Sequence, residues 1–123
     1  MPVHHGMGNH EVFGLYTESG IDPSHELYGK KMFENRLAKP YYSFDENEWH
    51  FIMLDPIGYT EDRHYYGYID SVQTEWLKTD LAAVGTEKPV VVVTHIPLVS
   101  IGAQIMEGPT EPFSKGSIVT NAN

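Results

Sequence analysis

The sequence has no cysteine, which excludes disulfide bonds, thiolate metal ligands and a cysteine nucleophile. Basic residues are also scarce, since 8 Lys and Arg stand against 17 Asp and Glu and the formal net charge is −9. A broad electrostatic surface for nucleic acid or anionic lipid needs clustered basic residues. We therefore expect no nucleic-acid groove and no electrostatic attachment to membranes.

Long hydrophobic runs are missing as well. The longest run, residues 90–93 with their immediate neighbours, is far shorter than a bilayer span requires. The sequence therefore predicts no membrane partner, and the cellular compartment stays open. The composition itself is globular, with 41% hydrophobic and 12% aromatic residues in a chain of 123. We predict one domain, or part of one, over residues 1–123.

Local patterns in the first half predict a strand, a helix and a hairpin. Residues 1–3 are expected to end a strand that runs into the glycine turn at residues 6–8. Residues 25–37 have a loose apolar stripe after a Pro-Ser pair, which favours a helix. Residues 41–44 and 49–54 flank a polar turn and predict a β-hairpin.

The second half predicts a loop, a helix and a buried strand. Residues 55–68 lack a regular period and indicate a long surface loop. Residues 71–84 predict a helix capped by Asp70 or Ser71, with Gln73 returning the capping hydrogen bond to Asp70. Its expected buried face holds the apolar residues Val72, Trp76, Leu77, Leu81 and Val84. Residues 89–94 are a β-branched run, typical of a central strand covered on both sides. The predicted fold class is therefore α/β.

Two short segments carry candidate metal-site chemistry. Asn9 and His10 follow the first predicted strand, and His95 follows the last one. An amide oxygen and a neutral imidazole suit a divalent ion such as Zn, Mn or Fe. A nearby imidazole that does not bind the ion can protonate a leaving oxygen. We therefore single out the segments around Asn9 and His10 and around His95 as the candidate functional site.

The order of several segments resembles the calcineurin-like metallophosphoesterases. The matching segments run in the family's order from Pro2 to about Leu98: Gly8-Asn9-His10-Glu11, Tyr42-Ser43-Phe44, Trp49-His50-Phe51-Ile52-Met53-Leu54-Asp55, Gln73-Thr74-Glu75-Trp76-Leu77 and Thr94-His95-Ile96-Pro97. The resemblance implies a layered β-sandwich flanked by helices. It also implies hydrolysis of a phosphomonoester or phosphodiester by a water that two divalent ions activate. In that scheme Asn9 and His95 bind metal, His10 protonates the leaving group and Glu11 supports the loop.

The sequence also departs from this family. No Asp-x-His and no Gly-Asp-x-x-Asp segment precedes Asn9, and no Gly-His-x-His segment follows His95. Residues 121–123 resemble the opening of the helix before that missing motif. We therefore expect an internal segment of a longer protein, inactive by itself, with an incomplete sandwich that self-associates through exposed sheet edges.

Two other interpretations stay open. One is a non-catalytic fragment or binding module of the same fold, without a working metal centre. The other is a mononuclear metal hydrolase of another fold, which would take further ligands from His4, His64 or nearby acids. His5, His25 and His50 are expected to be structural or solvated. Residues 59–68, rich in tyrosine, are as typical of loop anchors as of a stacking surface for a base or sugar.

Overall fold

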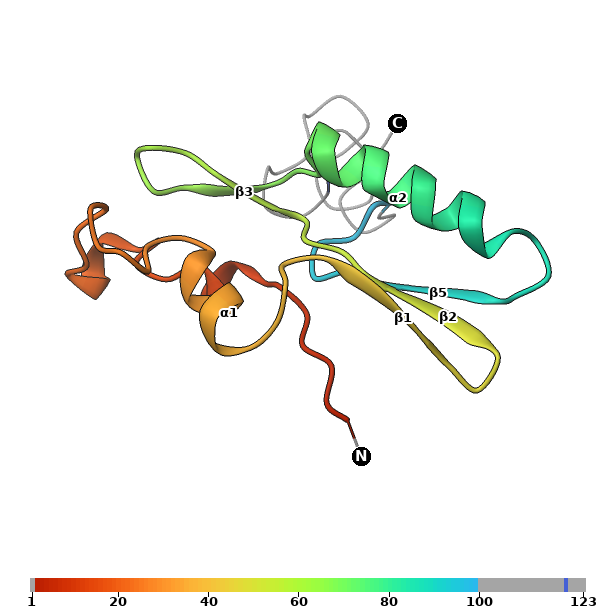
Figure 1. The fold of residues 1–123 in the computed structure, drawn as a ribbon. Coiled ribbons are helices and arrows are strands. Elements are labelled where there is room, and N and C mark those ends of the chain that lie inside the picture. Colours follow the sequence, from red (N-terminus) through yellow and green to blue (C-terminus); the bar gives the residue numbers. More distant parts are fainter. Residues whose placement is uncertain (1, 100–118, 120–123) are drawn as a thin grey trace, which may run out of the picture.

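The computed structural model describes residues 2–99 and 119, and its fold is mixed α/β, as predicted (Figure 1). Its larger sheet has three strands, β1 (Tyr42–Glu46), β2 (Trp49–Met53) and β5 (Val90–Val93). The strand order is β1-β2-β5, with β1 antiparallel and β5 parallel to β2. Because β2 and β5 are parallel, the residues that follow them emerge at the same end of the sheet.

The predicted hairpin is confirmed as β1 and β2. Its connection is a two-residue turn at Asn47 and Glu48, whose φ angles are +49° and +69°. Two consecutive positive φ angles match the right-handed twist of paired strands, and asparagine adopts this conformation readily. The turn is therefore tighter than the polar stretch in the sequence suggests.

The loop prediction for residues 55–68 is wrong, because this segment contains a second sheet. Strands β3 (Ile57–Tyr59) and β4 (Tyr65–Gly67) form an antiparallel hairpin. At Gly58, an added Cβ would lie only 2.6 Å from the Tyr66 ring, so the ring packs directly on the glycine backbone. Three-residue strands that each contain glycine produce no alternation in the sequence, which is why the pattern indicated a loop.

The expectation that β5 is a central, covered strand is also wrong. Within the described residues β5 pairs only with β2 and lies at the edge of its sheet. Val90, Val92 and Val93 expose 36–46% of their surface. A run of β-branched residues indicates a strand, whereas the number of strands that pair with it depends on the rest of the fold.

The first predicted helix is much shorter than expected. Helix α1 covers only Lys31–Arg36, because Gly29 has φ +74° and so lies outside the helical region. Gly29 instead exchanges two backbone hydrogen bonds of 2.9 Å with Phe13. The predicted strand at the N-terminus is wrong too, since residues 2–8 contain no strand. They run beside the larger sheet, where the His4 ring stacks on Phe44 with 3.5 Å between centroids.

Helix α2 (Ser71–Val84) is confirmed, with Asp70 as its N-cap. The Asp70 carboxylate accepts a 2.7 Å hydrogen bond from the backbone N–H of Gln73, and Gly85 ends the helix at φ +73°. The Gln73 side chain does not return a bond to Asp70, contrary to the prediction. It is buried and pairs with both backbone groups of Asp55 instead.

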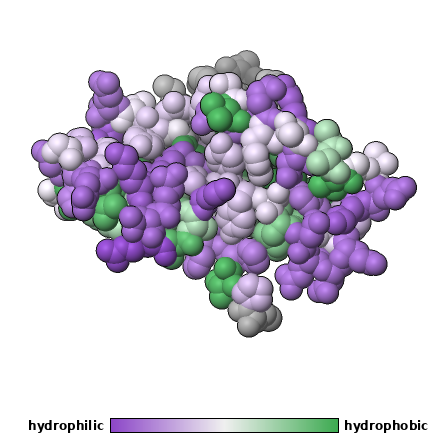
Figure 2. Space-filling view, in the orientation of Figure 1, coloured by the Kyte–Doolittle hydropathy of each residue, from purple (hydrophilic) through white to green (hydrophobic). Residues whose placement is uncertain are grey.

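The hydrophobic core lies between α2, the two sheets and the N-terminal turns. Its buried members are Met7, Val12, Leu15, Phe33, Ile52, Leu54, Ile57, Ile69, Ile96 and Val119. Trp76 and Leu77 of α2 pack against this core, whereas Val72 and Leu81 are exposed, contrary to the predicted face. The face drawn in Figure 2 is mainly hydrophilic, with its apolar residues in small separate groups.

Helix α2 runs along one side of the three-stranded sheet, and the N-terminal segment lies on the other side (Figure 1). In the part of the chain that is described, no helix combines the length and the apolar character needed to cross a bilayer. The predicted similarity of residues 121–123 to a helix start lies outside the described residues.

Candidate functional site

Asn9 and His95 lie together although 86 residues separate them in the sequence. The Oδ1 atom of Asn9 is 2.9 Å from the Nε2 atom of His95. Asn9 is buried in the short 3-10 helix Asn9–Glu11, and His95 lies two residues after the end of β5. The contact is a hydrogen bond, which Nε2–H donates to Oδ1. The same two atoms are those through which amide and imidazole side chains bind metals, provided that the ring proton lies on Nδ1. Their separation is close to that of two neighbouring ligands on one ion, about 3 Å.

Gly8 makes this close approach compatible with the backbone. A Cβ at Gly8 would lie 3.3 Å from Cγ and Nδ1 of the His95 ring and 2.7 Å from a carboxylate oxygen of Glu11. The glycine backbone is therefore in contact with the ring, and any side chain there would displace the ring or Glu11. A carboxylate oxygen of Glu11 lies over the same turn.

Tyr16 holds the Asn9 amide in one orientation. The Nδ2 group of Asn9 donates a 2.6 Å hydrogen bond to the Tyr16 hydroxyl, so Oδ1 is directed toward His95. The ring of His10 lies 5.5 Å from the ring of Tyr16, between centroids. Tyr16 thus contacts both Asn9 and the exposed His10, while His95 joins this group through Asn9. Sequence reasoning missed Tyr16, because nothing distinguishes it from the other seven tyrosines.

A cavity of about 250 Å³ opens beside His95. It is lined by the glycine turn before Asn9 and by residues at the carboxyl ends of β2 and β5, including Leu54 and Thr94. The Thr94 hydroxyl donates to the carbonyl oxygen of Ile96 and closes the turn that presents His95. Parallel strands place the residues that follow them at one end of the sheet, where ligands commonly bind in α/β folds.

The described residues do not complete a metal centre. Among them, no three or more His, Asp or Glu side chains are arranged to hold an ion. Asn9 and His95 are both neutral ligands, and two neutral ligands are too few for a catalytic divalent ion. The donor types fit such an ion, but their number does not.

Further metal ligands from His4 or His64 find no support in the geometry. The His4 ring packs against Phe44, on the three-stranded sheet. His64 is 79% exposed and lies near Asp62 in the turn between β3 and β4. Within the described residues, neither histidine contacts Asn9 or His95. They therefore add no ligand to a single-metal site at that position.

The other histidines have structural surroundings. The backbone of His5 exchanges two 3.0 Å hydrogen bonds with the Tyr42 hydroxyl. The His25 ring meets Phe13 edge-on and accepts from a backbone N–H in its own turn. His50 is buried between the carboxylates of Asp45 and Asp80.

Comparisons of the sequence with protein-family models, with curated proteins and with solved structures find no match. The metallophosphoesterase resemblance therefore stays a prediction, and the pairing of Asn9 with His95 stands on the geometry alone.

Proposed function

We propose that this chain is part of a metal-dependent phosphoester hydrolase, in which Asn9 and His95 supply two ligands of the metal centre. The contact that supports this proposal is the 2.9 Å approach of Asn9 Oδ1 to His95 Nε2 across 86 residues. This contact is a hydrogen bond that Nε2–H donates to Oδ1, and both atoms can bind a metal ion when the ring proton lies on Nδ1 instead. A cavity opens beside His95. The remaining ligands must come from residues outside the described part of the chain.

His10 is the proposed general acid for the leaving oxygen. The His10 side chain is exposed and lies beside Tyr16. Among the described residues it has no hydrogen-bond partner, so its ring nitrogens are free to exchange a proton with a substrate. Its neighbour Tyr16 bonds to Asn9, so the acid and the first ligand are held in one unit. The proposed substrate is a phosphomonoester or phosphodiester.

The same proposal includes the layered β-sandwich. The three-stranded sheet has α2 on one face, and on its other face Phe44 and Phe51 stack with 5.0 Å between centroids and remain half-buried. An apolar sheet face of this kind suits a second sheet packed against it. Two small sheets, and an aromatic face that the N-terminal segment covers only in part, fit an incomplete member of that architecture.

Manganese binding tests the proposal, because a paramagnetic ion reveals even weak contact. In a 15N-labelled sample titrated with Mn²⁺, we expect the amide signals around Asn9 and His95 to broaden first. His95→Ala is expected to abolish this selectivity, whereas His25→Ala, at an exposed histidine remote in sequence, leaves it unchanged. Broadening centred on the acidic turns, with none at Asn9 and His95, would contradict the proposal.

A non-catalytic fragment of the same fold is the second candidate, and the count of only two neutral ligands favours it. Hydrolysis of p-nitrophenyl phosphate separates the two. Metal-stimulated release of nitrophenol supports the enzyme, and none at any metal concentration supports the fragment. Where activity exists, His10→Ala should slow poor leaving groups most and spare metal content. Equal slowing of good and poor leaving groups would count against the acid role.

A further inference from the structure

A cavity of about 720 Å³ lies between α1, α2 and the start of β1. A smaller one of about 220 Å³ adjoins it, and the two share Lys30, Asp55 and Asp70. Neither is lined by Asn9, His10 or His95. The proposed hydrolase chemistry therefore makes no use of this space, and sequence reasoning did not identify it.

Two aromatic rings form one wall of the larger cavity. Tyr41 precedes β1 and Trp76 belongs to α2, and their ring centroids are 4.9 Å apart with the planes inclined by 51°. Both residues are half-buried, so part of each ring stays open to the cavity. Faces of Trp and Tyr attract flat apolar groups and cations.

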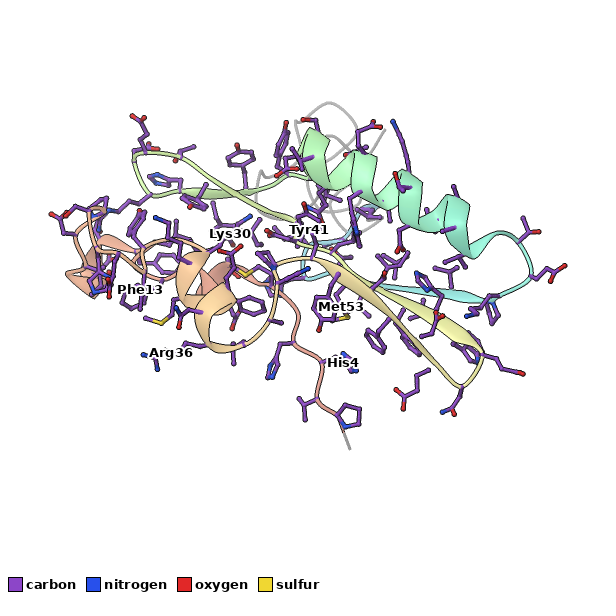
Figure 3. All side chains as sticks on the ribbon, in the orientation of Figure 1. His4, Phe13, Lys30, Arg36, Tyr41 and Met53 are labelled. Atoms are coloured by element: carbon purple, nitrogen blue, oxygen red, sulfur yellow. The ribbon has the colours of Figure 1, made fainter. Side chains whose placement is uncertain are left out.

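An ion pair closes the inner end of the cavity. The Lys30 ammonium donates to Asp55 Oδ2 at 2.5 Å and to the Ile57 carbonyl oxygen at 2.6 Å. Figure 3 shows Lys30 at the entry to α1, near the labelled Tyr41. Burial raises the pKa of the Asp55 carboxyl, and the Lys30 charge offsets that effect in part. The charge of Lys30 is therefore engaged within the protein and offers little to an anion.

The rest of the lining is acidic on balance. Glu34 and Asp70 add two carboxylates, and Lys39 adds one further ammonium. With the Lys30 and Asp55 charges cancelling, two negative charges face one positive charge. The net charge of −9 on the chain has the same sign and repels anionic ligands from the whole surface.

We propose that this cavity binds a small organic cation, a primary amine carried on a flat ring. The ring packs on Tyr41 and Trp76, and the ammonium lies near Glu34 and Asp70. This inference stands apart from the proposed hydrolase function, because none of its residues belongs to the Asn9 and His95 site.

The test compares two probes of similar size that carry the same ring and opposite charges, 2-phenylethylamine and phenylacetate. The chain has two tryptophans, so a 15N-labelled sample gives two indole N–H signals, which Trp49→Phe assigns. Trp76 lines the cavity, whereas Trp49 lies at the far end of the hairpin. We expect 2-phenylethylamine to shift the Trp76 signal saturably and phenylacetate to leave it in place.

Charge-removing variants locate the ammonium. Glu34→Gln alters an exposed side chain, and Asp70→Asn keeps a residue that caps helices well. Each should weaken 2-phenylethylamine binding by about threefold to tenfold. Glu75→Gln, an exposed carboxylate on α2 outside the cavity, should leave the affinity unchanged.

Three results would overturn the inference. They are the absence of a saturable Trp76 shift, equal binding of phenylacetate, and a Glu75→Gln effect as large as that of Glu34→Gln. A failed Mn²⁺ titration leaves this inference intact, and failed amine binding leaves the hydrolase proposal intact.

Discussion

Replacing Asp80 with Asn tests how the protein holds α2 on the three-stranded sheet. His50 of β2 is only 5% exposed, and its two ring nitrogens meet two carboxylates. Nδ1 lies 2.7 Å from Asp45 of β1, and Nε2 lies 2.8 Å from Asp80 of α2. The Asp80 carboxylate also accepts a 2.6 Å hydrogen bond from Ser43, and Asp45 accepts one of the same length from Lys88. Asp80 is therefore the direct polar link from α2 to both β1 and β2.

The distances from His50 to Asp45 and to Asp80 are nearly equal, so the difference in stability expected between the two variants follows from how buried each carboxylate is. The Asp80 side chain is 16% exposed and that of Asp45 is 55% exposed. A hydrogen bond to a charged, mostly buried group contributes about 1.5–3 kcal/mol. An exposed ion pair contributes about 1 kcal/mol or less. We expect Asp80→Asn to lower the free energy of unfolding by about 2 kcal/mol, and Asp45→Asn to lower it by less than half of that.

The loss in the free energy of unfolding caused by Asp80→Asn should depend on pH. Burial of the ring opposes protonation of His50, but the hydrogen bonds and charges of Asp45 and Asp80 outweigh it, so the pKa of His50 is raised. A group whose pKa is higher in the folded state stabilises the protein fully below its unfolded pKa, about 6.5 for histidine. This stabilisation is lost as the pH rises through the higher folded pKa. Asp80→Asn should therefore cost more at about pH 6 than at about pH 8.5.

Urea unfolding followed by circular dichroism measures all three proteins at both pH values. Repeating the measurement at several protein concentrations separates folding from self-association. Equal costs for Asp80→Asn and Asp45→Asn would refute the argument from burial. A cost for Asp80→Asn that is the same at both pH values would refute the role of the His50 charge.

Three further predictions concern the backbone and the sheet edge. Gly29→Ala should lower the free energy of unfolding by about 2 kcal/mol or more, because φ is +74° and the new Cβ would meet a tyrosine hydroxyl. Gly20→Ala, at φ +67° with nothing within 4 Å, should cost about 1 kcal/mol, and equal costs would show that the clash is relieved. Gln73→Leu should cost about 3 kcal/mol in the same assay, because both backbone groups of Asp55 lose their partner, and a cost below about 1 kcal/mol would contradict this. Finally, β5 is an edge strand in the part of the chain that is described, and this edge should make the chain elute as an oligomer in size-exclusion chromatography at micromolar concentration, with Val92→Lys shifting it toward monomer; a compact wild-type monomer would end that proposal.

Where the sequence misled, the deciding contact was distant. The helix expected over residues 25–37 begins only after Gly29, because that glycine has a positive φ and bonds to Phe13. The apolar stripe in the sequence gives no sign of this contact. The strand at residues 90–93 exists as predicted, but its position at an edge depends on which strands lie beside it. The expected loop after Asp55 is a hairpin whose strands are too short to show a period.

The candidate site, like the fold, was predictable from the sequence only in part. The residues around Asn9 and His95 were singled out from their types and their order along the chain. Their approach to 2.9 Å depends on the Gly8 turn packing against the His95 ring, and the orientation of the amide depends on Tyr16. The cavity at Lys30 and Asp55 needs α1, α2 and β1 at once, so no segment of the sequence contains its signal.

The sequence by itself determined the elements whose causes lie within a few residues. Helix α2 has its Asp70 cap and its Gly85 stop in the printed string, and the β1 and β2 hairpin has its polar turn there. Only the tertiary structure decided which strand is an edge, that Gln73 serves the backbone of Asp55, and that His50 is held between Asp45 and Asp80. The reason is physical: capping and turn formation are local, whereas burial and polar pairing depend on which distant segments the fold brings together.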